Sequence, residues 1–485
     1  MPMTVSLSSL STFGDVSAEE DAVLEYFVTT DAVQKLEQNE VFIILGRKGA
    51  GKTALVRHFT ESGHRSLSKP LNLRGYPWNL HSERVDRGAS EIEAYVSSWR
   101  YLIAIEFASL VLSKSERPQY QEVINLTNFM NENYGGPHPK LSDILRPRRI
   151  KLSKFSFAPS VLGNALGGVD LERGRGDLQL GLELNALSEA ILSSARAIAE
   201  NESLGPLMLH FDELDQGLAE FDENRSRMII GLILAARQIR REMRESTVQF
   251  SPIIYLRTDL WDDLEFSDKN KISQGLALKV EWTSQSLNEL VNLRLSARLG
   301  RDVSWEDVST DDLMRGSQTK WNHILARSFL RPRDIIAFLN AALHFAKIRD
   351  EDPCIFTNPD IVDARERYSS YLKLELDDEI LPHWPNWEEA LQACSAISTI
   401  TFDRSEFDSE YSRRKTKGNT IDSEEALQTL YKFSVIGYER RSGYGGSSWA
   451  FQYTDPEVGY DNSANRFKVH LGLKEYAKLR ETRQQ

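Results

Sequence analysis

Short, largely apolar runs recur through the first 281 residues of the chain and predict buried strands. They occupy residues 41–45, 207–211, 252–256 and 276–281, with a further short run near 71–74. Apolar runs of about five residues are typical of parallel strands that are buried on both faces. Strands of this kind, joined by helical crossovers, predict a three-layer α/β domain with a parallel sheet.

Longer segments repeat apolar positions every three or four residues, which predicts helices with a buried face. They are residues 90–112, 224–245, 286–298 and 335–346. The helix at 224–245 also carries a stripe of basic residues at spacings of three and four: Arg237, Arg240, Arg241 and Arg244. This stripe either presents an arginine to an adjacent subunit or pairs with acids on its own surface.

One glycine-rich loop, between the run at 41–45 and a helix-compatible stretch at 54–59, carries the strongest chemical signal. Its residues fit the pattern G-x-x-x-x-G-K-[ST] and are Gly46, Arg47, Lys48, Gly49, Ala50, Gly51, Lys52 and Thr53. The glycines let the backbone curl so that its N–H groups face a phosphate at the positive end of the helix. The lysine then reaches the β and γ phosphates, and the threonine hydroxyl can bind Mg²⁺. A chance glycine-rich turn is the alternative, but the order of strand, loop and helix favours a phosphate-binding loop.

A pair of carboxylates, Asp212 and Glu213, follows the apolar run at 207–211. A phosphate-binding loop requires an acidic residue at the end of a second strand, where Asp212 would hold the metal ion. Glu213 then occupies the position of a general base that can orient or deprotonate the attacking water. A strand that simply ends in a polar turn is the alternative. For Asp215, either a structural role or a contact with a neighbouring subunit is open.

Three arginines are candidates to contact the phosphates. Arg257 follows the third strand, where P-loop ATPases place a residue that senses the γ-phosphate, in the manner of an arginine finger. An ion pair of Arg257 with Asp259 or Asp262 is the alternative. Arg331 and Arg333 precede the helix at 335–346 and suit a helical lid that closes over the nucleotide. The alternative for these two is a helix start braced by ion pairs.

Residues 146–184 differ in character from the core around them. Several glycines and a local polar–apolar alternation predict a β-hairpin insertion. The segment begins with a basic cluster of Arg146, Arg148, Arg149, Lys151 and Lys154. The cluster either binds nucleic acid or an acidic partner, or it forms a solvated face.

The last hundred or so residues predict a winged-helix-like module. A helix at 424–431 is followed by strands at 435–439 and 449–453, which flank a glycine-rich turn at 440–448, and by a closing helix at 469–476. The basic residues of this end are Arg413, Arg414, Lys415, Lys417, Arg440 and Arg441. They make DNA contact possible, although winged helices also serve as protein-interaction and lid elements.

Composition narrows the class of protein. The 485 residues are 41% hydrophobic, which supplies more than one core and excludes wholesale disorder. The two cysteines, Cys354 and Cys394, exclude a disulfide scaffold and fit a reducing compartment. No apolar run approaches the roughly 18 residues of a membrane span, and no export signal is visible, so we expect a cytoplasmic protein without a membrane partner. The net charge of −12 argues against general coating of nucleic acid but leaves local basic patches open.

Several motifs together resemble a family of bacterial P-loop ATPases in the wider AAA+/STAND group, of the kind found in antiphage defence loci. They are GRKGAGKT, LHFDELD, YLRTDLW, VEWTSQSLNELVNLRLSARL, FLRPRDIIAFLN and KVHLGLKEY. The resemblance covers most of the chain and implies an ATPase core, a helical lid and a winged-helix-like domain, which we place at 1–284, 285–350 and 351–485. It implies ATP and Mg²⁺ as ligands and assembly into a homo-oligomer. No effector domain is recognisable in the sequence, so a toxic activity would belong to a separate effector protein.

Three functions follow from these residues. The preferred hypothesis is an ATP-driven switch in a defence complex, in which the nucleotide state controls assembly or a partner. The second is a DNA-acting AAA+ ATPase with a terminal winged helix, and the third is a scaffold that binds nucleotide without hydrolysing it. The preference for adenine or guanine stays open, because no N-K-x-D motif stands out.

Overall fold

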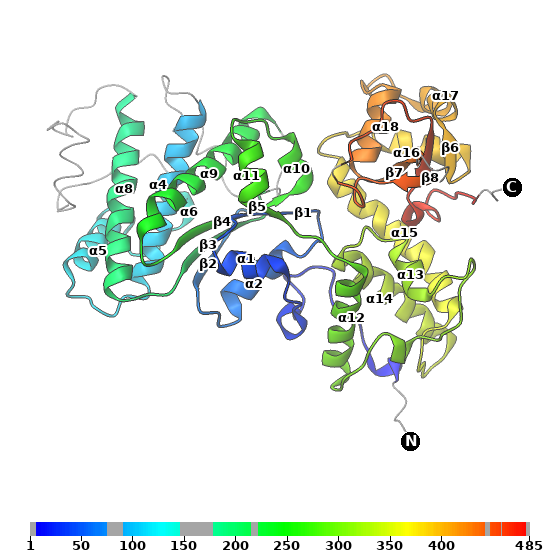
Figure 1. Ribbon diagram of the computed structural model, residues 1–485, viewed down its shortest axis with the longest axis horizontal. Coiled ribbons are helices and arrows are strands. Elements are labelled where there is room, and N and C mark those ends of the chain that lie inside the picture. Colours follow the sequence, from blue (N-terminus) through cyan, green and yellow to red (C-terminus); the bar gives the residue numbers. More distant parts are fainter. Residues whose placement is uncertain are drawn as a thin grey trace. The chain divides into compact units, whose positions relative to one another are not determined.

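The computed structural model describes residues 6–74, 91–145, 178–214, 222–441, 447–456 and 458–481. The chain divides into two compact units (Figure 1). The first, here called the sheet unit, comprises Thr29–Gly46 and Leu55–Val280. The second, here called the C-terminal unit, comprises Met1–Val28, Arg47–Ala54 and Glu281–Gln485. The phosphate-binding loop therefore packs with residues that follow it by more than 200 positions.

The sheet unit is built on a five-stranded parallel sheet in the order β2-β3-β4-β1-β5. The strands are β1 Ile43–Gly46, β2 Leu67–Asn72, β3 Leu207–Asp212, β4 Phe250–Arg257 and β5 Ala277–Lys279. Every residue of β1, β3 and β4 is buried, as the uninterrupted apolar runs predict. The predicted strands are thus confirmed, with β2 beginning a few residues earlier than expected.

Helices cover both faces of this sheet, which confirms the three-layer α/β architecture. Figure 1 shows α1 and α2 on one face, and α9, α10 and α11 on the other. The bounds are α1 Asp31–Glu37, α2 Lys52–Glu61, α4 Glu91–Leu112, α5 Gln121–Tyr134, α6 Leu141–Leu145, α8 Leu178–Asn201, α9 Glu223–Glu242, α10 Thr258–Asp263 and α11 Lys269–Gly275. Helix α4 packs between α8 and α9 and is apolar along its length, because it is covered on several sides.

The predicted β-hairpin at 146–184 lies mostly outside the described residues, together with its basic cluster. Its last part is wrong, because residues from Leu178 onward belong to α8. Leucines at alternate positions suggested a strand, but Leu184, Leu187 and Ile191 are all buried at spacings of three and four. Packing of this helical stripe in the core therefore decides the structure.

The C-terminal unit begins with helices that enclose a second core. They are α12 Ser284–Leu299, α13 Lys320–Leu325, α14 Pro332–Arg349, α15 Asn358–Ile380 and α16 Glu388–Ile397. Helix α14 has Pro332 at its first turn, where the missing N–H and the fixed φ suit a helix start. Helices α14 and α15 pack against each other over much of their length. The three predicted domain boundaries remain predictions.

A four-stranded antiparallel sheet in the order β6-β9-β7-β8 completes this unit. Its elements are β6 Thr401–Asp403, α17 Arg404–Arg414, α18 Ser423–Lys432, β7 Ile436–Arg441, β8 Ser447–Ala450 and β9 Arg466–Val469. Helix α18 followed by the β7–β8 hairpin confirms the winged-helix-like module. The strands reach further into the predicted turn than expected, since residues 440–441 and 447–448 pair with each other.

The predicted closing helix at 469–476 is wrong. Val469 ends β9, and only a single 3₁₀ turn, Leu471–Leu473, follows it. The His470 N–H donates to the carbonyl of Val435 at 2.9 Å, and the His470 ring accepts from the Gly472 N–H at 3.1 Å. These contacts to a distant strand and within the turn replace the hydrogen bonds of a helix.

Candidate nucleotide-binding site

In the sheet unit, candidate catalytic residues gather at the carboxyl edge of the sheet. Gly46 ends β1 and pairs with Arg257 at the end of β4, and Asp212 ends β3 on the other side of β4. Carboxyl ends of parallel strands meet at one edge of a sheet, where α/β proteins bind ligands. The phosphate-binding loop continues directly from Gly46, so chain connectivity starts it at this edge.

The acidic doublet is buried at this edge. Asp212 and Glu213 are each only 7% exposed. The Asp212 carbonyl accepts a hydrogen bond from the Leu73 N–H at 3.1 Å, which ties the doublet to the chain after β2. Glu213 has φ = 59°, in the left-handed region that non-glycine residues enter uncommonly. A buried glutamate in this conformation, directly after the aspartate predicted to bind the metal ion, suits a positioned base.

A buried pair, His210 and Tyr255, lies two residues before Asp212 on β3 and two residues before Arg257 on β4. No sequence motif marks this pair. The His210 Nδ1 and the Tyr255 hydroxyl are 2.9 Å apart, and the Phe59 ring of α2 stacks on His210. Burial, with a smaller contribution from His64, lowers the pKa of His210 to about 3, so the ring is neutral. Burial and then the charge of Asp212 raise the pKa of Tyr255 well above its usual value. Because side chains alternate along a strand, the pair shares a face with Asp212 and Arg257.

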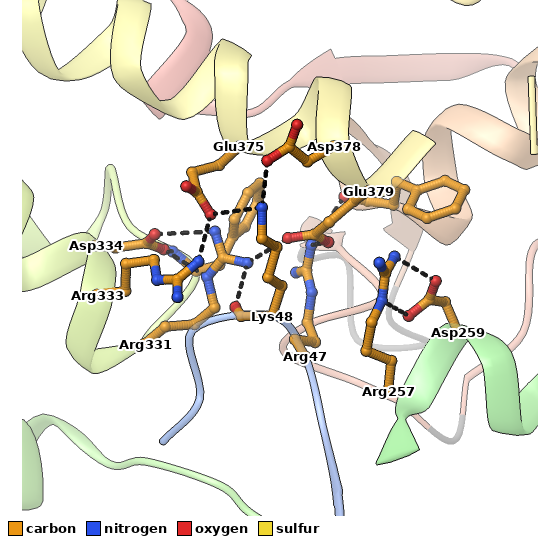
Figure 2. Close-up of polar contacts among 12 residues, drawn as sticks. Arg47, Lys48, Arg257, Asp259, Arg331, Arg333, Asp334, Glu375, Asp378 and Glu379 are labelled. Carbon is orange, nitrogen blue, oxygen red and sulfur yellow. Dashed lines mark hydrogen bonds and ion pairs between the residues drawn. The ribbon is translucent and has the colours of Figure 1, made fainter. Parts of the chain in front are cut away.

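Arg257 makes the ion pair that the sequence offered as an alternative. Its Nε donates to Asp259 Oδ1 at 3.0 Å and its Nη2 to Asp259 Oδ2 at 2.6 Å (Figure 2). Arg257 is 6% exposed, and this two-point contact fixes its guanidinium plane. Its proposed role toward the γ-phosphate stays a prediction.

In the C-terminal unit, the phosphate-binding loop has the backbone that its glycines allow. Gly49 and Gly51 have φ values of 78° and 99°, which L side chains rarely adopt. A Cβ on Gly49 would stand 2.7 Å from the Cβ of Arg333, so the close approach also requires glycine. The Ala50 N–H and the Lys52 Nζ both donate to the Arg47 carbonyl, at 3.1 and 3.2 Å.

Arg331 is buried against this loop and held by two carboxylates. Its Nη1 donates to the Lys48 carbonyl at 2.8 Å and to Glu379 at 2.6 Å, and Asp334 binds its Nε and Nη2 (Figure 2). Burial alone lowers the pKa of Arg331, but Asp334 and Glu379 outweigh it and raise the pKa well above its usual value. The predicted ion-pair brace at the start of α14 is therefore present, and it also reaches the loop.

Three acidic residues of α15, Glu375, Asp378 and Glu379, form what we call the acidic edge. Figure 2 shows them pointing from α15 toward the basic residues of the loop and of α14. Lys48 binds Asp378 at 2.5 Å and lies 3.6 Å from Glu375, which also binds Arg333 at 2.9 Å. The spacing of three and four residues along a helix is the only sequence signal for this edge.

Arg47 connects the loop to both α15 and the end of α18. Its Nη2 donates to Glu379 at 3.3 Å and to the Phe433 carbonyl at 3.2 Å. Its guanidinium also lies 4.3 Å from the centre of the Phe329 ring. Burial, partly offset by Glu379, lowers the pKa of Arg47. Arg47, at a position where the motif allows any residue, therefore contacts the winged-helix-like module through the Phe433 carbonyl.

Trp282, which the sequence analysis did not select, contacts the other side of the loop. Its indole Nε1 donates to the Ala50 carbonyl at 2.9 Å. Its ring would be 3.8 Å from a Cβ on Gly51. The residue stands just after β5 and just before α12, where nothing in the motif marks it.

The donor set of these motifs fits a magnesium nucleotide. Within the described part of the chain, no hydrogen bond reaches the amide N–H of Gly49 or Gly51, and both residues lie in the loop just before α2. Such amides, with a lysine beside them, suit phosphate oxygens. Hydroxyl and carboxylate oxygens, such as those of Thr53 and Asp212, are of the kind that Mg²⁺ takes in addition to phosphates, and these two residues stay the predicted metal ligands.

Other basic candidates pair with nearby groups. Arg237 binds Asp268 at 3.0 Å, and Arg240 donates to the Asn39 carbonyl at 2.7 Å, so these members of the α9 stripe serve their own surface. In the winged-helix-like module, Arg413 and Arg414 both bind Glu410. Arg440 of β7 is exposed. Asp215 and the cluster at 146–154 lie outside the described residues.

The five-stranded parallel sheet, the G-x-x-x-x-G-K-[ST] loop after β1 and the acidic doublet at the end of β3 are those of a P-loop nucleotide-binding core. Among the described helices, none has the length and apolar character to cross a bilayer.

Comparison with known proteins adds one family match. Residues 285–377, from α12 almost to the end of α15, match the FunZ-associated C-terminal helical domain. No curated protein matches the chain.

Two solved structures show a weak likeness. The Orc1 protein of Aeropyrum pernix, solved in complex with DNA, has 12% identity and a TM-score of 0.35, covering 93% of this chain and 92% of its own. Cdc6p from Pyrobaculum aerophilum has 11% identity and a TM-score of 0.30, covering 98% and 97%. The class of the protein rests on its own strand order and motifs.

Proposed function

We propose that this protein is an ATP-driven switch that hydrolyses Mg·ATP and uses its nucleotide state to control assembly and a separate effector protein. The observation that carries the proposal is the pairing of an intact phosphate-binding loop with a buried, left-handed Glu213 after Asp212. A protein that only held nucleotide would not need a strained carboxylate next to its metal ligand.

Each motif residue has a defined task in this proposal. Lys52 neutralises phosphate charge, while the loop amides bind the phosphate oxygens. Glu213 orients or deprotonates the attacking water. Mg²⁺, held by Thr53 and Asp212 together with the phosphates, would supply charge neutralisation.

The contacts of the loop support a switch rather than an isolated hydrolase. Arg47 and Lys48 stand next to the phosphate-binding amides and bind the acidic edge of α15 and the Phe433 carbonyl. A change of loop conformation on nucleotide binding would therefore alter contacts to α15 and to the winged-helix-like module. The motif resemblance supports the proposal that this protein acts in an antiphage defence complex. Two of those motifs, VEWTSQSLNELVNLRLSARL and FLRPRDIIAFLN, lie largely within the FunZ-associated match.

The experiment compares the wild type with Lys52→Ala and Glu213→Gln. Lys52→Ala should abolish tight Mg·ATP binding, because the phosphate charge loses its neutralising partner. Glu213→Gln should keep binding but slow phosphate release by roughly 100-fold or more, as loss of a positioned base implies. Binding is measured by calorimetry and hydrolysis by phosphate release. Fast turnover by the Gln variant would assign the base to another residue. Phosphate release that is absent from both the wild type and the Gln variant, with unchanged function, would favour the non-hydrolysing scaffold.

One observation favours the DNA-acting alternative. Arg440 is exposed on β7, the strand that leads to the tip of the wing. Against it, residues 398–485 contain 14 Lys or Arg and 13 Asp or Glu, so this end has little net positive charge. Hydrolysis stimulated by duplex DNA would establish the alternative.

A further inference from the structure

Two peptide carbonyls of the phosphate-binding loop are held from outside the loop. The Arg331 Nη1 donates to the Lys48 carbonyl at 2.8 Å, and the Trp282 Nε1 donates to the Ala50 carbonyl at 2.9 Å. Both donors belong to the C-terminal unit, as do the carbonyls that they hold. They come from different elements, one from the start of α14 and one from the segment before α12.

The geometry of the peptide bond gives these contacts a consequence. No peptide bond among the described residues is cis. In a planar trans peptide, the C=O and the next N–H point in opposite directions. A donor that holds the Lys48 carbonyl outward therefore turns the Gly49 N–H inward, and a donor on the Ala50 carbonyl does the same for the Gly51 N–H. Within the described chain, no hydrogen bond reaches either of these two N–H groups.

We infer that Trp282 and Arg331 are positioning residues that preset the Gly49 and Gly51 amides for phosphate. The inference rests on the proposed nucleotide-binding function. Glycine peptides rotate freely, so without an outside partner the two amides would sample many directions and would pay an ordering cost on binding. Fixing their carbonyls in advance removes that cost.

The surroundings of the two donors show that they are fixed themselves. The Arg331 guanidinium donates four hydrogen bonds of 2.6 to 3.0 Å. Two go to Asp334, one goes to Glu379 and one goes to the Lys48 carbonyl of the loop. Arg331 is 2% exposed, so water does not compete for it. The Trp282 ring packs at the edge of the core of this unit and stands beside Gly51.

Trp282 is the better residue to test. Loss of Arg331 would leave Asp334 and Glu379 buried without their partner and would endanger the fold. Trp282→Phe keeps an aromatic ring and removes the N–H donor. Trp321→Phe is the matched control, since the Trp321 Nε1 donates to the Ser284 Oγ at 3.0 Å in the same unit and does not touch the loop.

The experiment measures Mg·ADP affinity and its competition by inorganic pyrophosphate in the full chain. Trp282→Phe should weaken both by the same factor, about 5- to 10-fold, as loss of one hydrogen bond implies. Trp321→Phe should change neither by more than about twofold, as expected of a residue outside the contact. In the wild type, the indole N–H resonance of Trp282 should shift when Mg·ADP is added.

Specific outcomes overturn the inference. Unchanged affinity for Mg·ADP and pyrophosphate in Trp282→Phe would do so. Weaker Mg·ADP binding with unchanged pyrophosphate competition would also do so, because the Trp282 ring would then act on the nucleoside and not on the phosphates. A lower unfolding midpoint with unchanged phosphate affinity would show a structural role alone. Failure of the wild type to bind Mg·ADP at all would instead overturn the proposed function, so the two failures are distinguishable.

Discussion

Glu379 joins the phosphate-binding loop to α15, and its replacement by Gln gives the sharpest test of the contacts described above. Its side chain is 4% exposed and accepts from Arg331 at 2.6 Å and from Arg47 at 3.3 Å. Gln keeps the shape but removes the charge. The buried Arg331 and Arg47, whose side chain is 21% exposed, are then left with Asp334 as their main anionic partner. Breaking a buried ion pair from one side costs about 3–5 kcal/mol. Because the Gln oxygen still accepts a hydrogen bond, we expect about 3 kcal/mol, at the lower end.

Asp378→Asn is the matched control for this substitution. Asp378 neighbours Glu379 on the same helix and also binds a basic residue of the loop, Lys48 at 2.5 Å. Its side chain, however, is 65% exposed, and that of Lys48 is 23% exposed. An ion pair open to water contributes about 0–1 kcal/mol, so Asp378→Asn should change little. The two variants therefore differ mainly in burial.

The assay is urea-induced unfolding of the full chain, followed by tryptophan fluorescence and by circular dichroism. Trp384 and Trp387 are buried in the same unit as Glu379 and report on its transition. The free energies of unfolding of wild type, Glu379→Gln and Asp378→Asn are compared at neutral pH. A loss below about 1 kcal/mol in Glu379→Gln, equal to the Asp378→Asn value, would refute the assignment of a buried ion pair.

Two further predictions concern the buried histidine and the exposed wing. Burial lowers the pKa of His210 to about 3, whereas the unfolded value is about 6.5, so its stabilisation is complete above about pH 6.5 and is lost as the pH falls toward 3. Between pH 7 and 5, the loss of unfolding free energy in urea should be about 2 kcal/mol smaller in His210→Asn than in the wild type, whereas the exposed His344→Asn should match the wild type. Burial also lowers the pKa of His323 and of His470 to about 3, and these two contribute equally in all three proteins, so equal losses in the three would contradict the prediction. For the wing, the proposed switch predicts that duplex DNA leaves ATP hydrolysis unchanged in the wild type and in the Arg440→Ala/Arg441→Ala variant, measured by phosphate release. Stimulation that the double variant loses would favour the DNA-acting alternative.

Local sequence predicted the elements whose stability depends on near neighbours in the chain. The runs at 41–45, 207–211 and 252–256 are strands because a continuous apolar run has to be buried on both faces. The glycine spacing of the loop predicted a backbone with positive φ, which Gly49 and Gly51 have. Helix α14 begins at Pro332, as the residue types around it indicate.

Local sequence failed where two periodicities competed or where a distant strand completed a sheet. Alternating leucines near residue 178 suggested a strand, but core packing selects the helical register of Leu184 and Leu187. The predicted helix at 469–476 begins at the end of β9, where Val469 pairs with β7 and the His470 N–H donates to the carbonyl of Val435. Only a 3₁₀ turn, Leu471–Leu473, follows. Propensity contributes only a few tenths of a kcal/mol per residue, and tertiary packing overrides it.

The sequence by itself indicated the chemistry proposed for this protein: a loop whose pattern fits phosphate, and a doublet, Asp212 and Glu213, that suits metal binding and water activation. The tertiary structure alone decided what holds that loop. Glu379 lies 332 residues from Arg47, and Trp282 lies 232 residues from Ala50, so no local spacing signals either contact. The residue types of the motif are constrained by the phosphates and the metal ion that such a loop accommodates. Their outer partners are constrained only by the way this particular chain folds back on itself, and that depends on burial summed over the whole core.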